Sequence, residues 1–282
     1  MLRILAALAL MNSSTSSSPL VPDTPDSLRA LAHAYYSWQQ TNYPVASSDQ
    51  GLHTWDDRLT DYRLPAVRTR RKHVELLLQR VRAMRTIDWG RDDQVDWLLF
   101  RAQLEGAAFF PRVLSPEESD PQLYVGEVSN GIFSLLKKEY APHRTRALAA
   151  AARLEAVPAL LEVARQNLRR PVRLYARLAI DAARGGDDLY TSSLMTLADQ
   201  LSAEERTRLD RARDAALAAL HQFADWLEAR LSTMPEWTPM GEANYNYLLK
   251  HVYLLPLDAT QVAMLGEAEL ARYRGLEAML SD

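Results

Sequence analysis

The chain has 282 residues, and its 33 basic and 36 acidic side chains leave a net charge of −3 at pH 7. This near balance argues against a nucleic-acid partner, because proteins that bind phosphate backbones need a basic surface. The sequence contains no cysteine, which excludes disulfides, thiolate zinc sites, a cysteine nucleophile and a lipidated N-terminal cysteine.

Residues 1–25 have the pattern of an export-signal-like leader followed by a flexible linker. Arg3 precedes an apolar run over residues 4–11, and small polar residues follow, the order typical of a bacterial export signal. The serines and prolines up to Pro25 predict a flexible linker. We therefore expect export to the periplasm or the extracellular space, with a cytoplasmic protein as the alternative. No later stretch approaches the roughly 18 apolar residues of a stable membrane span.

Residues 26–282 predict one all-α domain, a multi-helix bundle of about ten helices, because apolar residues recur at helical spacing between proline and glycine breaks. No segment alternates apolar and polar residues as a strand would. The expected helices cover about 26–40, 65–84, 92–111, 122–139, 142–171, 171–184, 187–200, 203–231, 241–255 and 258 to the end. Two capping patterns support this division, one at Thr24 or Asp26 and one formed by Ser202 with Glu205.

The central helix is expected within residues 142–171. Leu154, Val157 and Leu161 belong to an apolar stripe along it, so the helix should be buried, whereas Arg153 is expected away from the stripe. Pro158 removes a backbone donor in the helix interior, at a cost of roughly 3 kcal/mol. Surrounding helices must then hold a kink, or the helix breaks in two.

Two connections are expected to be loops. Residues 47–64 carry Gly51, Asp56, Asp57 and Asp61, and predict an ordered loop whose side chains bond the backbone. A loop of this length is unusual in a compact domain, so it is a candidate for function. Residues 115–121 predict a short acidic loop.

Familiar catalytic motifs are missing from the sequence. It contains neither the H-E-x-x-H zinc motif, nor a G-x-S-x-G motif, nor a glycine-rich phosphate loop. His53 with Asp56 or Asp57, and His221 with Asp225, are the best remaining pairs for a metal. Turn capping explains the first pair more simply, and an exposed ion pair explains the second. Asp93, Asp96 and Glu105 are acidic residues that could provide an acid and base pair, but a helix surface is the simpler interpretation of all three.

A series of motifs resembles the bacterial domain-of-unknown-function 885 family. Each motif is short, but the motifs occur in the order and at the spacing of the family over nearly all of the chain after Pro25. In chain order they are Tyr35-Tyr36-x-Trp38, Pro44, Gly51-x-His53-x-Trp55-Asp56-Asp57-Arg58-Leu59-x-Asp61, Asp93-Gln94-Val95-Asp96, Asp120-Pro121-x-x-Tyr124, Tyr140-Ala141-Pro142, Arg153-Leu154-x-x-x-Pro158, Ala164-Arg165-x-Asn167-Leu168-x-x-Pro171, Gly241-x-x-Asn244-Tyr245-x-x-Leu248-Leu249 and Leu254-Leu255-Pro256.

This resemblance implies a helical protein similar to zinc-dependent peptidases of the gluzincin type, which are often exported. In that family the zinc-binding histidine and glutamate motif lies in a second half, beyond the matched region. The chain is therefore expected to be an N-terminal half whose partner is the missing C-terminal half. Zinc is expected only in that half, so we assign this chain no cofactor and no catalytic or metal-binding residue.

The resulting hypothesis is a zinc-metallopeptidase-like protein in which this chain forms one wall of a substrate channel and is inactive alone. A peptide-like substrate is implied. The substrate-channel candidates are His53, Asp56 and Asp57 in the long loop, and Tyr245 and His251 on a late helix. One alternative is a stand-alone helical binding or scaffolding domain. Another is a complete metalloenzyme that uses His53 and the loop aspartates.

Overall fold

The protein is an assembly of helices in the computed structural model, which describes residues 23–280. Within that range every regular element is helical, which confirms the all-α prediction. The leader predicted for residues 1–25 lies outside the described residues except for its last three. The α-helices are α1 Pro25–Asn42, α2 Pro44–Asp49, α3 Leu64–Arg82, α4 Arg91–Leu114, α5 Pro116–Ser119, α6 Gln122–Leu136, α7 His143–Asn167, α8 Arg173–Gly185, α9 Ala203–Glu228, α10 Glu242–Tyr247 and α11 Ala259–Leu280.

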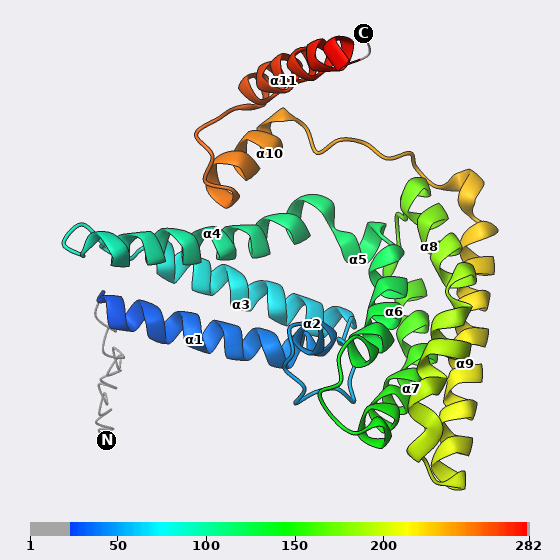
Figure 1. Cartoon of the computed structure of the whole chain (residues 1–282). Helices are drawn as coiled ribbons and strands as arrows, with labels where there is room; N and C mark the ends of the chain where they lie inside the picture. The colour runs from blue at the N-terminus through cyan, green and yellow to red at the C-terminus, as the bar shows by residue number, and fades with distance from the viewer. Residues whose placement is uncertain (1–22, 281–282) are drawn as a thin grey trace, which may run out of the picture.

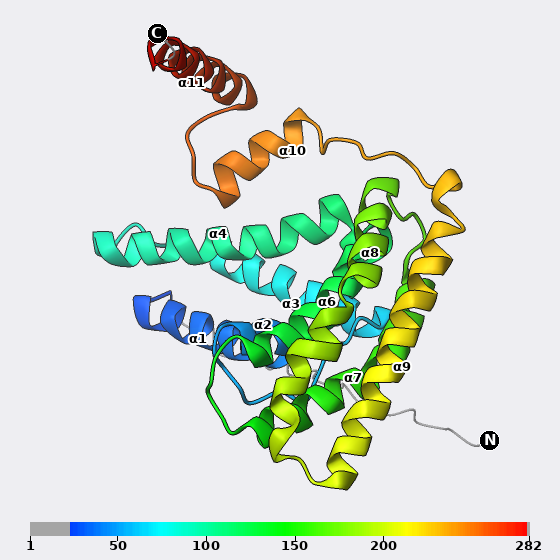
Figure 2. The ribbon, with the colours of Figure 1, turned by 45° about the vertical axis from the view of Figure 1, so that its right-hand side comes forward.

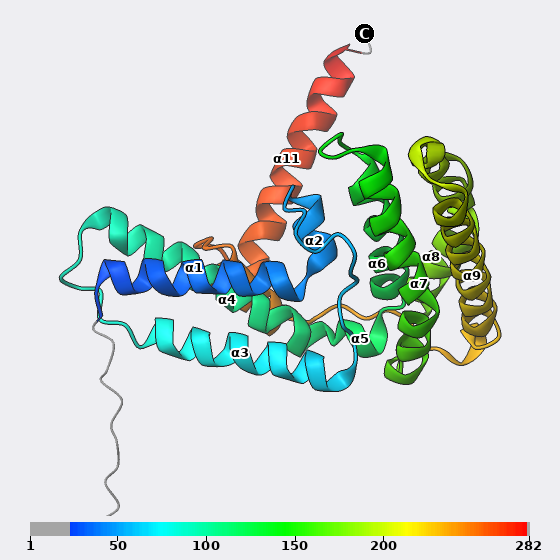
Figure 3. The ribbon, with the colours of Figure 1, turned by 90° about the horizontal axis from the view of Figure 1, so that it is seen from below.

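The helices form two groups, which lie beside one another in Figures 1 and 3. In the first group α1, α3 and α4 run side by side and share a core that includes Leu28, Tyr35 and Leu104. In the second group α6, α7, α8 and α9 enclose a larger core that includes Leu154 and Phe223. The short helix α2 contacts both α1 and α6, so it connects the two groups.

Local side-chain hydrogen bonds fix where several helices begin. At the start of α1 the Thr24 side chain accepts a hydrogen bond from the Ser27 amide at 3.2 Å, and the Ser27 side chain completes a capping box. Ser202 and Glu205 form the same reciprocal pair at the start of α9. Both pairs satisfy amides that the first turn of a helix leaves without partners, as the sequence predicted.

Helix α7 is the buried central helix that the apolar stripe predicted. It continues through Pro158 to Asn167, so it does not break in two. Ala147, Ala150 and Ala151 are fully buried, and these small side chains let neighbouring helices approach the first half of α7 closely. Arg153, which was expected away from the stripe, is also fully buried, so that expectation was wrong.

Several predicted boundaries differ from the structure. The expected loop 47–64 begins inside α2, because Pro44 opens a new helix as well as ending α1. Helix α4 runs past Pro111 and ends before Ser115, whose φ of 46° leaves the helical region. The expected acidic loop contains the single turn α5. Residues 187–200 form a π-helical turn, η1 Leu189–Ser193, and a 3₁₀ segment, η2 Leu194–Gln200.

The last part of the chain returns to the first helix group. After α9 and the short 3₁₀ turn η3 Leu231–Thr233, an extended segment leads to α10 and the π-helical turn η4 Leu248–Val252, which packs on α4. Helix α11 then projects away from both groups in Figures 1 and 2, and none of its residues is buried. In the described range, no helix combines the length and the apolar character needed to cross a membrane.

Candidate functional site

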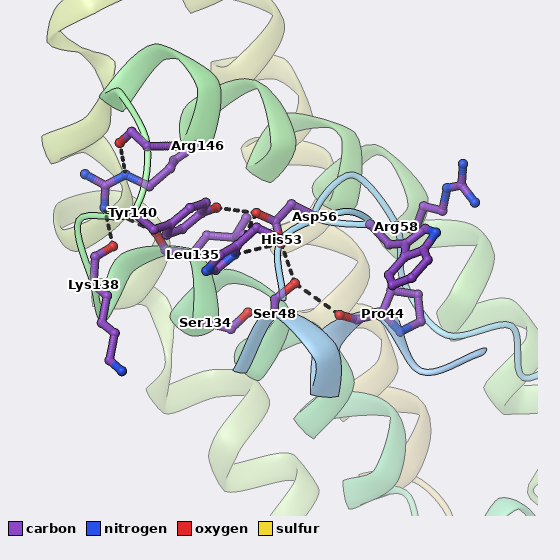
Figure 4. Close-up of polar contacts among 12 residues, drawn as sticks. Pro44, Ser48, His53, Asp56, Arg58, Ser134, Leu135, Lys138, Tyr140 and Arg146 are labelled. Carbon is purple, nitrogen blue, oxygen red and sulfur yellow. Dashed lines mark hydrogen bonds and ion pairs between the residues drawn. The ribbon is translucent and has the colours of Figure 1, made fainter. Parts of the chain in front are cut away.

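Asp56 is the centre of a polar cluster formed by the loop after α2 (Figure 4). Its carboxylate accepts a hydrogen bond from the Ser48 hydroxyl at 2.5 Å and lies 3.0 Å from Nδ1 of His53. The hydroxyl of Tyr140, which lies between α6 and α7, donates to the same carboxylate. The structure therefore brings together two of the predicted residues, His53 and Asp56, and adds Tyr140 and Ser48 to them.

The fully buried Arg153 supplies the positive charge of this Asp56 cluster. Its Nη2 lies 4.0 Å from Asp56 Oδ1. Burial lowers the pKa of Arg153, because it penalises the charged form, while Asp56 acts in the opposite direction. The guanidinium donates to the carbonyl oxygens of Arg58 at 2.9 Å and Gly131 at 2.5 Å, and to the hydroxyls of Ser134 at 3.1 Å and Ser48 at 2.6 Å.

Tyr140 and His53 close the Asp56 cluster toward solvent. Their rings are stacked, with centroids 3.2 Å apart and planes 3° apart. Burial, and then the neighbouring Asp56 carboxylate, raise the pKa of Tyr140 well above its ordinary value, so its hydroxyl stays protonated and can donate. The Asp56 side chain is 10% exposed and that of His53 is 21% exposed. This arrangement attaches the loop after α2 to α6 and α7.

Asp57 lies apart from the Asp56 cluster. Its side chain is 60% exposed, and its Oδ1 is 3.5 Å from Nε of the adjacent Arg58. Among residues 23–280, no three histidine, aspartate or glutamate side chains are grouped so that they could hold a metal ion. The geometry therefore gives no support to a metalloenzyme built on His53 and the loop aspartates. His221 pairs with Asp187 at 3.0 Å, while Asp225 pairs with Arg184.

A second polar cluster joins α3, α4 and α10 around Glu105. The Arg82 guanidinium bonds both carboxylate oxygens of Glu105, at 2.8 and 2.6 Å, and the Tyr247 hydroxyl donates to the same carboxylate at 2.5 Å. Burial acts to raise the pKa of Glu105, but the bonds from Arg82 and Tyr247 together outweigh it and hold the pKa below its ordinary value. Glu105 is only 3% exposed, so its predicted place on a helix surface was wrong.

The two remaining candidates lie beside this Glu105 cluster. The His251 ring is 4.5 Å from that of Tyr247, and Tyr247 in turn stacks on Phe109 at 5.4 Å. Tyr245 is half-buried on α10. The structure therefore brings His53 and Asp56 together and leaves Asp57 apart. It places His251 beside Tyr247, and Tyr245 on α10. In the described part of the chain, no hydrogen bond or ring contact joins the two clusters.

Sequence reasoning missed Arg153 and Glu105, although a signal was present for both. Arg153 lies four residues before Val157, which places it on the same helix face as the apolar stripe. Glu105 likewise lies four residues before the buried Phe109. A charged residue at a buried position of a helix predicts a paired polar cluster, because an unpaired charge there is too unfavourable.

Comparison with known proteins identifies a family and a relative of the same fold. The family model described as "Bacterial protein of unknown function (DUF885)" matches residues 44–278. A solved structure described as "a putative lipoprotein of unknown function from Shewanella oneidensis" superimposes with a TM-score of 0.76 at 20% identity. The match covers 88% of this chain and 46% of that one, so this chain spans about half the length of that relative. No curated protein matches the sequence. Because the family model covers most of the residues, the chain belongs to the DUF885 family of bacterial proteins.

Proposed function

We propose that this chain is the helical part of a zinc-metallopeptidase-like protein, that it forms one wall of a substrate channel, and that it is inactive alone. One observation carries this proposal. Helix α11 presents apolar side chains along its length and buries none of them. In a folded protein such a helix indicates a surface that a partner covers.

The proposed partner of α11 is a second portion that corresponds to the additional length of the Shewanella oneidensis relative. Met264, Leu265, Leu270, Tyr273 and Met279 are each more than half exposed, and together they offer an apolar surface to such a portion. We place the zinc ion in the second portion, because the resemblance to gluzincin-type peptidases implies a metal-binding motif there.

The channel wall in this proposal is made of α10 and η4, which lie between α4 and α11 (Figure 1). Tyr245 and His251 belong to this wall, and their side chains carry groups that can hydrogen-bond a peptide backbone. Asp57 is accessible to a substrate, whereas His53 and Asp56 contribute by holding the loop after α2 in place. A peptide-like substrate matches the hydrogen-bonding side chains of Tyr245 and His251 in this wall.

We also propose that the protein is exported to the periplasm or the extracellular space. The order of residues in the leader, and the description of the Shewanella oneidensis relative as a lipoprotein, support this compartment. Because the sequence has no cysteine, a lipid attached to cysteine is not part of the proposal. Fractionation of cells that express the native gene tests the compartment.

The decisive experiment begins with the gene sequence downstream of codon 282. We expect an in-frame continuation that encodes a histidine and glutamate zinc motif. The continuous protein should bind zinc stoichiometrically and hydrolyse members of a fluorogenic peptide library, whereas the 282-residue chain should do neither. Peptide hydrolysis by the 282-residue chain with its own bound zinc would refute the proposal.

The alternative, a stand-alone helical binding or scaffolding domain, is favoured by the two closed cores. Each helix group buries its own set of large apolar side chains, so the described residues have the interior of an independently folded protein. This alternative predicts a monodisperse chain that unfolds cooperatively and does not bind the dye ANS. The two-part proposal predicts strong ANS binding through α11.

A further inference from the structure

A cavity of about 830 Å³ opens among α1, α2, α4 and the residues that follow η4. Its walls come from three separate parts of the sequence, namely residues 35–50, residues 99–111 and residues 252–254, with Val74 of α3 added. Sites for small organic ligands in proteins have volumes of about 300–1,000 Å³ and mostly apolar walls. None of the five substrate-channel candidates lines this cavity, so it is a separate feature of the molecule.

The lining of the cavity is aromatic and amide-rich. Trp38, Tyr43 and Phe110 line it, together with four glutamines, Gln39, Gln40, Gln50 and Gln103. No lining residue, all of them within the described range, carries a formal charge at neutral pH. Buried charge without a partner is strongly unfavourable, so this lining favours an uncharged ligand.

Two of the aromatic rings that line the cavity contact basic side chains outside the lining. These contacts fix the rings, and the one with Arg70 makes cation binding unfavourable. The Arg70 guanidinium lies 5.2 Å from the centroid of the Tyr43 ring, and His73 stacks on Trp38 at 4.2 Å. Because Arg70 already engages the electron-rich face of Tyr43, a second cation on that ring would face like charge. The rings are therefore suited to stacking with a neutral aromatic group.

The wall after η4 has an unusual backbone. Leu254 lines the cavity with a φ of 55°, in the left-handed region that a leucine rarely adopts. The turn before it is π-helical, and Gly106 permits its approach, since a Cβ there would lie 3.1 Å from Val252 Cγ1. Both strained residues and π-helical turns gather at ligand sites in proteins.

We propose that this cavity binds a small uncharged molecule that carries an aromatic ring and an amide group. The ring stacks among Trp38, Tyr43 and Phe110, and the amide exchanges hydrogen bonds with the glutamine side chains at the cavity wall. A free aromatic amide and an aromatic residue within a peptide share this chemistry. The inference does not depend on the proposed function, because it requires neither zinc nor a second portion of protein.

The test is a charge series of nearly constant shape, measured by isothermal titration calorimetry with the full chain. At pH 6, N-acetyl-L-phenylalaninamide is neutral and N-acetyl-L-phenylalanine is an anion. L-Phenylalaninamide is a cation at this pH, because its α-amino group is protonated. We expect the neutral probe to bind at least about tenfold more tightly than either charged probe. Equal affinities, or no binding of the neutral probe at millimolar concentration, would overturn the proposal. A capped tripeptide that contains phenylalanine is titrated in the same way. Its affinity, compared with that of the neutral probe, distinguishes a residue within a peptide from a free aromatic amide.

Matched variants test whether the neutral probe binds in this cavity. Ala107→Phe fills the half-buried wall, and Ala218→Phe makes the same change on an exposed face of α9 as the control. Ala107→Phe should abolish binding of the neutral probe, while Ala218→Phe should keep it. Gln50→Trp, at an exposed position of the lining, obstructs the opening without entering the core. Circular dichroism verifies folding, and a folded Gln50→Trp or Ala107→Phe protein with unchanged affinity would refute the assignment.

Discussion

Helices α7 and α11 have similar lengths and are both rich in alanine and leucine, yet they lie in opposite environments. Eleven residues of α7 are buried, including Arg153 and Asn167, whereas α11 buries none. Helix α7 packs against α6, α9 and η2, while the main contacts of α11 are with α10. The comparison shows that apolar content alone does not decide burial, because a helix also needs neighbours that match its face.

The polar residues of the two helices follow the same difference. On α7 the buried Asn167 side chain donates to the Tyr62 carbonyl at 2.8 Å and to the Tyr124 hydroxyl at 3.0 Å. On α11 Arg272 forms an exposed ion pair with Glu269 one turn away. Buried hydrogen bonds of the first kind contribute more to stability than exposed ion pairs do. We therefore expect α7 to contribute more than α11 to the free energy of unfolding.

Arg153→Met should give the largest effect. The substitution leaves Asp56 as a buried carboxylate without its cation and also removes donors to two carbonyl oxygens, so the free energy of unfolding should fall by about 3–5 kcal/mol. Urea denaturation followed by circular dichroism measures the change. Arg144→Met on the exposed face of α7 is the control and should have a much smaller effect. Similar losses for both variants would contradict the buried role of Arg153.

Leu161→Ala should have the next largest effect. Leu161 is 1% exposed in the core of the second helix group, and its removal leaves a cavity as well as losing apolar contacts. A loss of about 2–5 kcal/mol in the free energy of unfolding is expected. A loss below about 1 kcal/mol would show that α7 is packed more loosely than the structure indicates.

Glu105→Gln tests how α10 is attached to α4. Loss of charged hydrogen bonds to Arg82 and Tyr247 should lower the free energy of unfolding by about 1–3 kcal/mol at neutral pH. Because the folded-state pKa of Glu105 lies below its ordinary value of 4.5, this stabilisation is present in full above pH 4.5. It is lost as the pH falls through the lower pKa of the folded state.

Denaturation at several pH values tests the predicted loss of this stabilisation at low pH. The difference between wild type and Glu105→Gln should be constant from neutral pH down to about pH 5 and should shrink below that. A difference that grows on acidification would mean that Glu105 is protonated in the folded protein. Glu204→Gln, at an exposed position of α9, is a control for a general effect of charge.

Leu270→Ala should have the smallest effect and is the matched partner of Leu161→Ala. Leu270 is 51% exposed on α11, so the same substitution should change the free energy of unfolding by no more than about 0.5 kcal/mol. If α11 instead packs against another surface in solution, the loss will approach that of Leu161→Ala, and the contrast between the two helices will disappear.

Local patterns in the sequence predicted much of the fold. The caps at Thr24 and Ser202, and the stripe through Leu154, depend only on residues within a few turns of one another. The partners of the buried Arg153 and Glu105 were not predicted, because Arg58 lies 95 positions from Arg153 and Tyr247 lies 142 positions from Glu105. Arg70 is also buried, at 5% exposed, and its guanidinium donates to the Asp61 carbonyl nine residues away.

The candidate site was predictable only in part. His53 and Asp56 are three residues apart, so their contact followed from the turn between them. Tyr140 reaches Asp56 from 84 residues away, and Tyr247 reaches Glu105 from 142 residues away. No helical period relates such pairs, so they become visible only when the helices are packed. The cavity beside α4 depends on the same kind of distant contact.

The return of α10 to α4 has a consequence for how the protein folds. Contacts between residues separated by more than a hundred positions form slowly, because a long chain must first close on itself. During synthesis α4 emerges well before residues 242–254, and the whole second helix group is made in between. The α4 face of the first group therefore stays uncovered until residues 242–254 have been synthesised. Until then, Glu105 and the apolar side chains beside it are open to chaperones.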